Sequence, residues 1–153
     1  MDVKYMERAL ELAKEAFDSD EVPVGCVIVL NDEIIGYGRN SRETDQKTFA
    51  HAEMIAIEMA NIKVGSWRLE DAEMYITLEP CIMCAGAIIQ ARIKNLYIGC
   101  TESKSGAFGS ICNIGKLEGL NHYPNVYDGI MHEESRVLLK SFFKQKRHKN
   151  KQK

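Results

Sequence analysis

Between residues 74 and 100, two short apolar runs enclose a segment with helical periodicity, and this arrangement constrains the fold most strongly. The runs at 74–78 and 95–100 have the length and the apolar content of buried strands. Five residues between them recur at helical spacing and share one face: Cys81, Cys84, Ala85, Ile88 and Ile89. The order strand, helix, strand predicts a βαβ unit with two parallel strands and a right-handed crossover.

A second pair of strands precedes this unit. Residues 23–30 and 33–37 are short apolar runs, and the Asn31-Asp32 pair between them is typical of a tight β-hairpin turn. A brief strand at 125–127 follows a long loop that is rich in glycine. The hairpin and the parallel pair together predict a mixed sheet of about five strands.

Three segments have the apolar periodicity of amphipathic helices. The first covers residues 3–17 with Asp2 as its N-cap, the second follows the polar loop 41–48 with Thr48 as a possible cap, and the third starts near Met131. Helices on both faces of a mixed sheet predict an α/β protein with a three-layer α/β/α sandwich.

The size and charge of the chain bear on its organisation and partners. We expect residues 1–153 to form one domain, because the length is typical of a single domain. From Lys140 onward there are seven Lys or Arg and no acid, whereas residues 1–139 have a net charge of −9. This basic C-terminal helix or tail is the part of the chain that would attract a polyanion such as RNA.

The sequence also suggests where the protein resides. No stretch approaches the ~20 apolar residues of a transmembrane helix, and the N-terminus is charged rather than signal-like. An odd number of cysteines, five, in a chain large enough to fold without disulfides fits a reducing compartment. We therefore expect a cytoplasmic protein with no membrane partner. Cys26, Cys100, Cys112 and Trp67 are interpreted as packing residues.

The residues that carry chemistry are His51 and Glu53 in a His-Ala-Glu motif, and Cys81 and Cys84 in Pro-Cys-Ile-Met-Cys. Taken alone, two cysteines at this spacing also occur in structural zinc sites, in thiol–disulfide motifs and as small buried residues. A single histidine near a helix start is often a cap or a surface residue. A structural zinc site needs four protein ligands, and no other cysteine has a spacing that suits the fourth position.

Taken together, the two motifs predict an open catalytic zinc site. Cys81 and Cys84, three residues apart on a helix, reach the same ion; His51 supplies a third ligand, and the fourth tetrahedral position is left for water. Both motifs lie at predicted helix N-termini, where the helix dipole favours thiolate over thiol. Glu53 is near enough to move a proton between that water and a leaving group.

These motifs resemble the signature of the zinc-dependent nucleobase deaminases. The chain is also similar over nearly its whole length to the bacterial tRNA-specific adenosine deaminases, through residues 21–25, 40, 50–53, 67–69, 75–86, 91–93, 106–110, 121–122 and 142–143. The resemblance implies a cytidine deaminase-like fold and hydrolysis of adenosine to inosine at wobble position 34 of a tRNA anticodon, with release of ammonia. It also implies a homodimer with one zinc per subunit, held by His51, Cys81 and Cys84, and Glu53 as proton shuttle.

Five further residues are candidates for contacts with RNA. The resemblance implies that Asn40 binds the flipped nucleoside, although an Asn after a strand often only caps or turns the chain. Glu102 stands where the family often has Asp, and it keeps the carboxylate of a residue expected to contact the anticodon loop. Lys104 is a candidate for a phosphate contact. Phe143 and Arg147 combine stacking with charge, as single-stranded RNA loops require, although a phenylalanine there equally suits helix packing.

Two other functions agree with the zinc motif. A deaminase of a free base or nucleotide, such as guanine, cytosine or deoxycytidylate, would use the same zinc, water and glutamate. The second is a non-catalytic, zinc-stabilised RNA-binding subunit, but a purely structural site gains nothing from an acid beside an open coordination position. The basic and aromatic C-terminal segment favours RNA over a free base.

Overall fold

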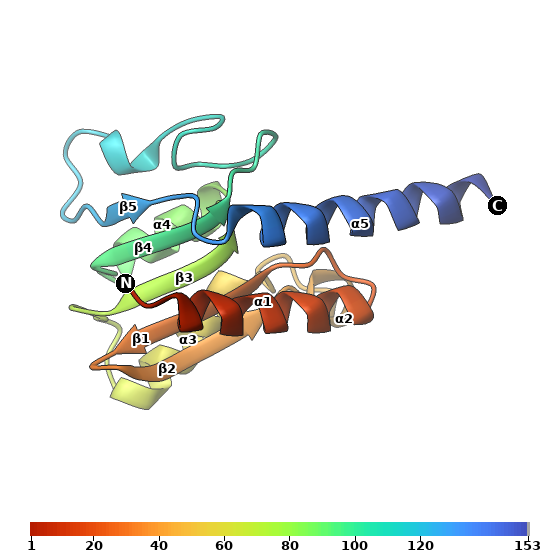
Figure 1. Cartoon of the computed structure of the whole chain (residues 1–153). Coiled ribbons are helices and arrows are strands. Elements are labelled where there is room, and N and C mark those ends of the chain that lie inside the picture. Colours follow the sequence, from red (N-terminus) through yellow and green to blue (C-terminus); the bar gives the residue numbers. More distant parts are fainter. Residues whose placement is uncertain (153) are drawn as a thin grey trace.

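The computed structural model describes residues 1–152, in which five strands form one mixed sheet (Figure 1). The strands are β1 (Gly25–Leu30), β2 (Glu33–Arg39), β3 (Glu73–Leu78), β4 (Asn95–Cys100) and β5 (Asn125–Tyr127). Their order is β2-β1-β3-β4-β5; β1 is antiparallel to β2 and β3, while β3, β4 and β5 run parallel. The predicted hairpin, βαβ unit and mixed sheet are therefore confirmed.

Helices cover both faces of this sheet (Figure 1). Two lie on each face: α1 (Val3–Asp18) and α5 (His132–Lys151) on one, α3 (Ala52–Val64) and α4 (Ile82–Gln90) on the other. Strand side chains alternate between the two layers: Val27 and Tyr75 belong to the core under α1, whereas Ile28 and Ile76 belong to the core under α3 and α4. The predicted three-layer sandwich is confirmed.

The polar segment 41–48 contains a short helix, α2 (Arg42–Asp45), where the sequence predicts only a loop. The buried carboxylate of Glu21 accepts hydrogen bonds from the backbone N–H groups of Glu43 (3.1 Å) and Thr44 (2.6 Å). These bonds satisfy donors that the first turn of a helix leaves unpaired. They join residues more than 20 positions apart, so the local sequence does not reveal the helix.

Other expectations about surface and loop residues are wrong. Trp67 is 56% exposed rather than packed inside the protein, and the guanidinium groups of Arg68 and Arg92 lie over its ring, 4.7 Å and 5.6 Å from the ring centroid. Cys112 is exposed, whereas the other two cysteines outside the motifs are buried as expected. The glycine-rich loop after β4 also contains a short 3₁₀ helix, η1 (Ile114–Lys116).

The basic C-terminal segment is the second half of α5, which continues beyond the sheet (Figure 1). Phe142 is buried against Phe17 of α1, with ring centroids 5.7 Å apart. The Nζ atoms of Lys146 and Lys149 lie 2.9 Å and 3.9 Å from the carboxylate of Asp20. Two of the basic side chains of α5 are therefore paired within the chain.

No helix within residues 1–152 is long and apolar enough to cross a bilayer.

Candidate active site

Three potential metal ligands meet where α3 and α4 begin. His51 is the N-cap of α3, Cys81 is the N-cap of α4, and Cys84 lies in the first turn of α4. Neither cap residue uses its side chain to bond its own helix, so the imidazole and the thiol are available to a ligand. The expectation that Thr48 caps α3 is wrong, because the chain enters the helix at His51. Since α4 follows β3, this corner lies at the carboxyl edge of the parallel strands, where α/β proteins commonly bind ligands.

The spacing of the three ligand atoms fits one zinc ion. His51 Nδ1 lies 3.6 Å from Cys81 Sγ and 3.5 Å from Cys84 Sγ. A tetrahedral ion bound at about 2.3 Å by sulfur and about 2.0 Å by nitrogen places such atoms about 3.5 Å apart. Nowhere else in residues 1–152 do three or more potential ligands come together in this way. Three ligands leave one tetrahedral position for another molecule.

The electrostatics of the cluster favour a thiolate at Cys81. The hydrogen bond from Cys84, together with the contact with His51, lowers the pKa of Cys81 to about 4. The same hydrogen bond, together with burial, raises the pKa of Cys84. The contact with Cys81 raises the pKa of His51. The Cys81 thiolate is a ligand that attracts a cation, and a bound cation would also favour the second thiolate.

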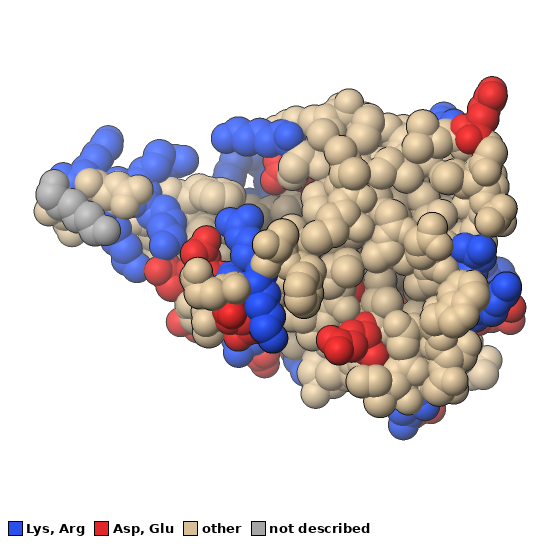
Figure 2. All heavy atoms as spheres, turned by 180° about the vertical axis from the view of Figure 1, so that it is seen from behind, with Lys and Arg blue, Asp and Glu red and all other residues tan. Residues whose placement is uncertain are grey.

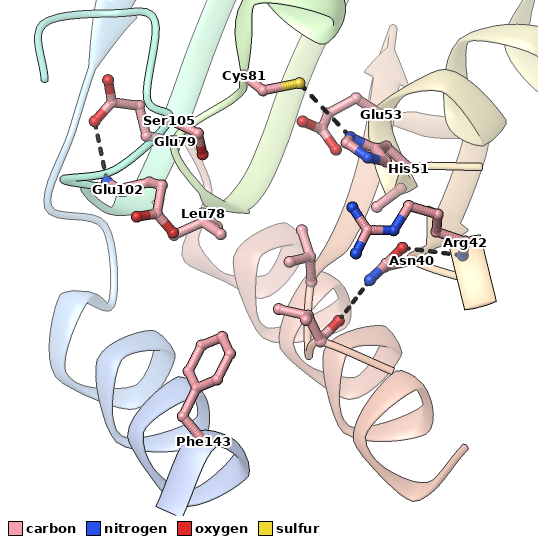
Figure 3. Close-up of a pocket in the computed structure, with 13 residues that line it drawn as sticks. Asn40, Arg42, His51, Glu53, Leu78, Glu79, Cys81, Glu102, Ser105 and Phe143 are labelled. Carbon is pink, nitrogen blue, oxygen red and sulfur yellow. Dashed lines mark hydrogen bonds between the residues drawn. The ribbon is translucent and has the colours of Figure 1, made fainter. Parts of the chain in front are cut away.

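Glu53 lies in the first turn of α3, directly beside these ligands (Figure 3). Its side chain is only 4% exposed. Burial raises the pKa of its carboxyl to about 7. A group with this pKa gives up or accepts a proton readily near neutral pH, which is what a general acid or base requires.

A pocket of about 200 Å³ opens beside the cluster (Figure 3). Six residues singled out in the sequence line it: Asn40, His51, Glu53, Cys81, Glu102 and Phe143. They come from the connection after β2, from α3 and α4, from the loop after β4 and from α5. The fold thus brings side chains from five separate parts of the chain to one cavity that reaches the metal ligands.

Two of these residues also hold the local backbone. The Asn40 side chain donates a hydrogen bond to the Val22 carbonyl (3.2 Å) and accepts one from the Arg42 backbone N–H (3.2 Å). The Glu102 carboxylate accepts a hydrogen bond from the Lys104 backbone N–H (2.9 Å). Asn40 therefore turns the chain, as an Asn after a strand often does, and also faces the pocket.

Lys104 and Arg147 do not line the pocket, although the sequence groups them with residues that do. They line an adjoining groove of about 660 Å³ between α5 and residues 101–110, which we call the pocket loop. Other basic residues of this groove are Arg136, Lys140 and Lys144. Figure 2 shows Lys and Arg side chains gathered along the projecting part of α5. Because Leu78, Glu102 and Phe143 line both cavities, the groove leads directly into the pocket.

The pocket also contains residues that sequence reasoning missed. Arg42, Glu79 and Ser105 line it (Figure 3). Their positions in the sequence offered a weak signal, because Arg42 follows Asn40 closely and Glu79 precedes the cysteine motif. Neither position has a periodicity or ligand spacing that would separate it from ordinary surface residues.

Comparisons with known proteins agree with this geometry. The family model for the cytidine and deoxycytidylate deaminase zinc-binding region matches residues 1–100, which include both ligand motifs. A tRNA-specific adenosine deaminase of Bacillus subtilis (strain 168) is 43% identical over 150 residues, 98% of this chain and 93% of the relative. One from Rickettsia typhi (strain ATCC VR-144 / Wilmington) is 45% identical over 144 residues, 93% and 97% of the two chains. A solved structure from studies of A-to-I editing by tRNA:A34 deaminases has a TM-score of 0.87 and 40% identity, covering 90% of this chain and all of the other.

Proposed function

The chain belongs to the cytidine and deoxycytidylate deaminase family, and we propose that it acts as a tRNA-specific adenosine deaminase. It hydrolyses adenosine to inosine at wobble position 34 of a tRNA anticodon and releases ammonia. The observation that carries this proposal is the similarity to tRNA-specific adenosine deaminases over 93% to 98% of the chain. The metal site alone does not identify the substrate, because the same chemistry serves cytosine, guanine and adenine. The basic groove beside the pocket supports RNA over a free base.

His51, Cys81 and Cys84 bind one zinc ion per chain in this proposal. The separations between their ligand atoms and the open fourth position support the assignment. When bound, zinc polarises a water molecule in the pocket and so supplies the nucleophile for hydrolysis. His51 binds as the neutral imidazole, and the low pKa of Cys81 keeps that ligand ionised at neutral pH.

Glu53 moves the protons of the reaction. Its carboxylate accepts a proton from the nucleophilic water and delivers a proton to the departing amine, which leaves as ammonia. The pKa near 7 supports both transfers, because neither protonation state is strongly favoured at neutral pH. Burial of the carboxyl also excludes bulk water that would compete for these protons.

The pocket and the groove divide the RNA contacts between them. Asn40 binds the target nucleoside, and Phe143 offers a ring on which a base can stack. Glu102 contacts the anticodon loop at the border of the two cavities. Lys104 and Arg147 bind phosphates in the groove. Their positions around one continuous opening support this division.

The proposed enzyme is a homodimer in the cytoplasm. Four apolar side chains on or beside α3 and α4 are more than half exposed: Phe49, Ile62, Trp67 and Ile82. Exposed apolar side chains of this size are what a second copy of the chain would cover. Analytical ultracentrifugation of the zinc-loaded protein at micromolar concentration tests the dimer, and a monomer there would contradict it.

The test of function is a substrate comparison. We expect inosine to form in an anticodon stem-loop RNA with adenosine at position 34, and not in the same RNA with that adenosine moved into the stem. Guanine, cytosine and deoxycytidylate should release no ammonia under the same conditions. Ammonia release from a free base or nucleotide without inosine formation would favour the alternative enzyme class. RNA binding with no turnover of any substrate would favour a non-catalytic subunit.

The pairing of α5 lysines predicts which of them contribute to RNA binding. Replacing Lys144 and Arg147 by Ala should lower the slope of log affinity against log salt by about 1.4, since each contact with single-stranded RNA contributes about 0.7. Replacing Lys146 and Lys149 removes the same charge but should lower the slope by only about 0.7, because the single negative charge of Asp20 already offsets one of the two lysines. Titrations of the stem-loop at several salt concentrations measure both slopes. If the two double substitutions lower the slope equally, the salt dependence reflects only the net charge of the chain, and the pairing with Asp20 does not matter for RNA binding.

A further inference from the structure

A buried carboxylate outside the ligand set connects the metal-binding segment to the pocket loop. Glu79 lies between β3 and the first cysteine ligand, and its side chain is 4% exposed. Its Oε1 accepts hydrogen bonds from the backbone N–H of Glu102 (3.1 Å) and from the Ser110 hydroxyl. Its Oε2 accepts from the backbone N–H groups of Phe108 (3.0 Å) and Ser110 (3.2 Å). All four donors belong to the pocket loop.

The physical cost of burying this group indicates how strongly it organises the loop. A buried carboxylate without compensation is expensive, and hydrogen bonds to an ionised acceptor are stronger than neutral ones. Glu79 forms no ion pair among residues 1–152, so these four bonds are its compensation. The loop backbone must therefore curl around the carboxylate to satisfy it.

Few other bonds hold the loop to this part of the chain. Between residues 79–80 and the pocket loop, the one further hydrogen bond runs from the Ala107 N–H to the Pro80 carbonyl (2.8 Å). The backbone also approaches the carboxylate closely at Gly106, because a Cβ added there would collide with the Glu79 carboxylate. Glycine at this position is what allows the loop to close over the charge.

The pocket loop carries the wall of the pocket that faces the substrate. Glu102 and Ser105 line the pocket (Figure 3). Lys104 lines the adjoining groove. None of the three metal ligands bonds the Glu79 carboxylate. The contacts that shape the substrate wall are thus separate from those that hold the metal ligands.

We propose that Glu79 is a positioning residue that sets RNA affinity by holding the pocket loop against the metal-binding segment. Although Glu79 borders the pocket, all four hydrogen bonds of its carboxylate go to the pocket loop, so it acts through the loop. The effect on RNA rests on the function proposed above, whereas the effect on the loop does not. Loss of the carboxylate should therefore raise KM for RNA and loosen the loop, while zinc content and kcat stay close to those of the unmodified protein.

The test compares Glu79→Gln, Ser110→Ala and the matched control Glu118→Gln in the full-length, zinc-loaded protein. Gln keeps the shape of the side chain but turns an amide N–H toward backbone donors, so at least one of the four bonds is lost. For Glu79→Gln we expect about a tenfold rise in KM for the stem-loop RNA, with kcat within about twofold. Ser110→Ala removes one bond and should give a smaller rise, and Glu118→Gln, an exposed change, should have no effect. Hydrogen–deuterium exchange of the backbone amides of residues 102–110 should be at least tenfold faster in Glu79→Gln than in the unmodified protein. The other two variants should not show an increase of this size.

Three outcomes would overturn the proposal. Unchanged KM and unchanged exchange in Glu79→Gln would show that the loop holds its position without the carboxylate. An equal fall in kcat with unchanged KM would place Glu79 in the chemical step. Loss of zinc together with the fold would make Glu79 a support of the whole site. If the unmodified protein has no activity on RNA, the proposed function fails, but faster exchange in the loop still supports the positioning role.

Discussion

Replacing Glu53 by Ala is expected to lower the rate of inosine formation by ~10² to 10⁴, the usual contribution of a positioned proton-transfer group. The nucleophilic water would lose its proton acceptor and the departing amine its proton donor. Zinc content and stem-loop binding should remain, because the carboxylate is not one of the three ligand atoms that come together in the cluster. Single-turnover kinetics with a saturating excess of enzyme, combined with elemental analysis, measures both quantities on one preparation.

Two further substitutions make this result specific. Glu53→Gln keeps the volume of the buried side chain and should be as inactive as Glu53→Ala, because an amide does not titrate near neutral pH. Glu58→Ala, an exposed change on the same helix, should leave the rate unchanged. A Glu53→Ala protein that deaminates within tenfold of the unmodified chain would remove Glu53 from the role of proton shuttle.

Replacing Cys84 by Ala is expected to lower bound zinc from about one ion per chain to near zero, and inosine formation to background. Only His51 and Cys81 would remain as protein ligands, and two ligands fill only two of the four tetrahedral positions of a zinc ion. The fold should survive, because Ala at this buried position removes one atom and adds no polar group. Zinc measured after gel filtration, alongside circular dichroism, separates metal loss from unfolding.

The matched control for this prediction is Cys112→Ala, which removes an exposed thiol outside the cluster and should leave zinc content unchanged. Acidification should mimic the loss of a ligand, because thiolates and imidazole bind metal only when deprotonated. The contact with Cys81 raises the pKa of His51, so protons should begin to displace zinc from this ligand at a higher pH than from an isolated histidine. Undiminished zinc in Cys84→Ala would exclude this cysteine as a ligand.

The cluster of potential metal ligands and the helices that carry it were predictable because their signals are local. Cys81 and Cys84 are three positions apart, and the apolar residues of α4 follow the same helical face. The turn at Asn31 and Asp32 is equally local, since both residues adopt the positive φ that a two-residue hairpin turn requires. In each case the residues that decide the structure lie within a few positions of one another.

The division of the RNA-binding candidates was not predictable in the same way. Asn40, Glu102 and Phe143 reach the pocket, whereas Lys104 and Arg147 face the groove. Glu102 and Lys104 are only two residues apart in a loop without periodicity, so the sequence contains no rule that brings Glu102 to the pocket and leaves Lys104 in the groove alone. The backbone of this loop is bonded to Glu79, which lies more than 20 positions earlier in the chain.

The sequence by itself determined the order of strands and helices, the mixed sheet, and the three potential ligands with their neighbouring acid, because periodicity and short spacings act within one element. Only the tertiary structure decided that α2 forms, what shape the pocket loop takes, and which basic side chains of α5 have no acidic partner within residues 1–152 and are available to RNA. These depend on Glu21, Glu79 and Asp20, which bond groups 22 to 126 positions away in the chain. A carboxylate bonds whichever donors the fold brings within about 3 Å of it, and no feature of the residues next to it specifies those donors.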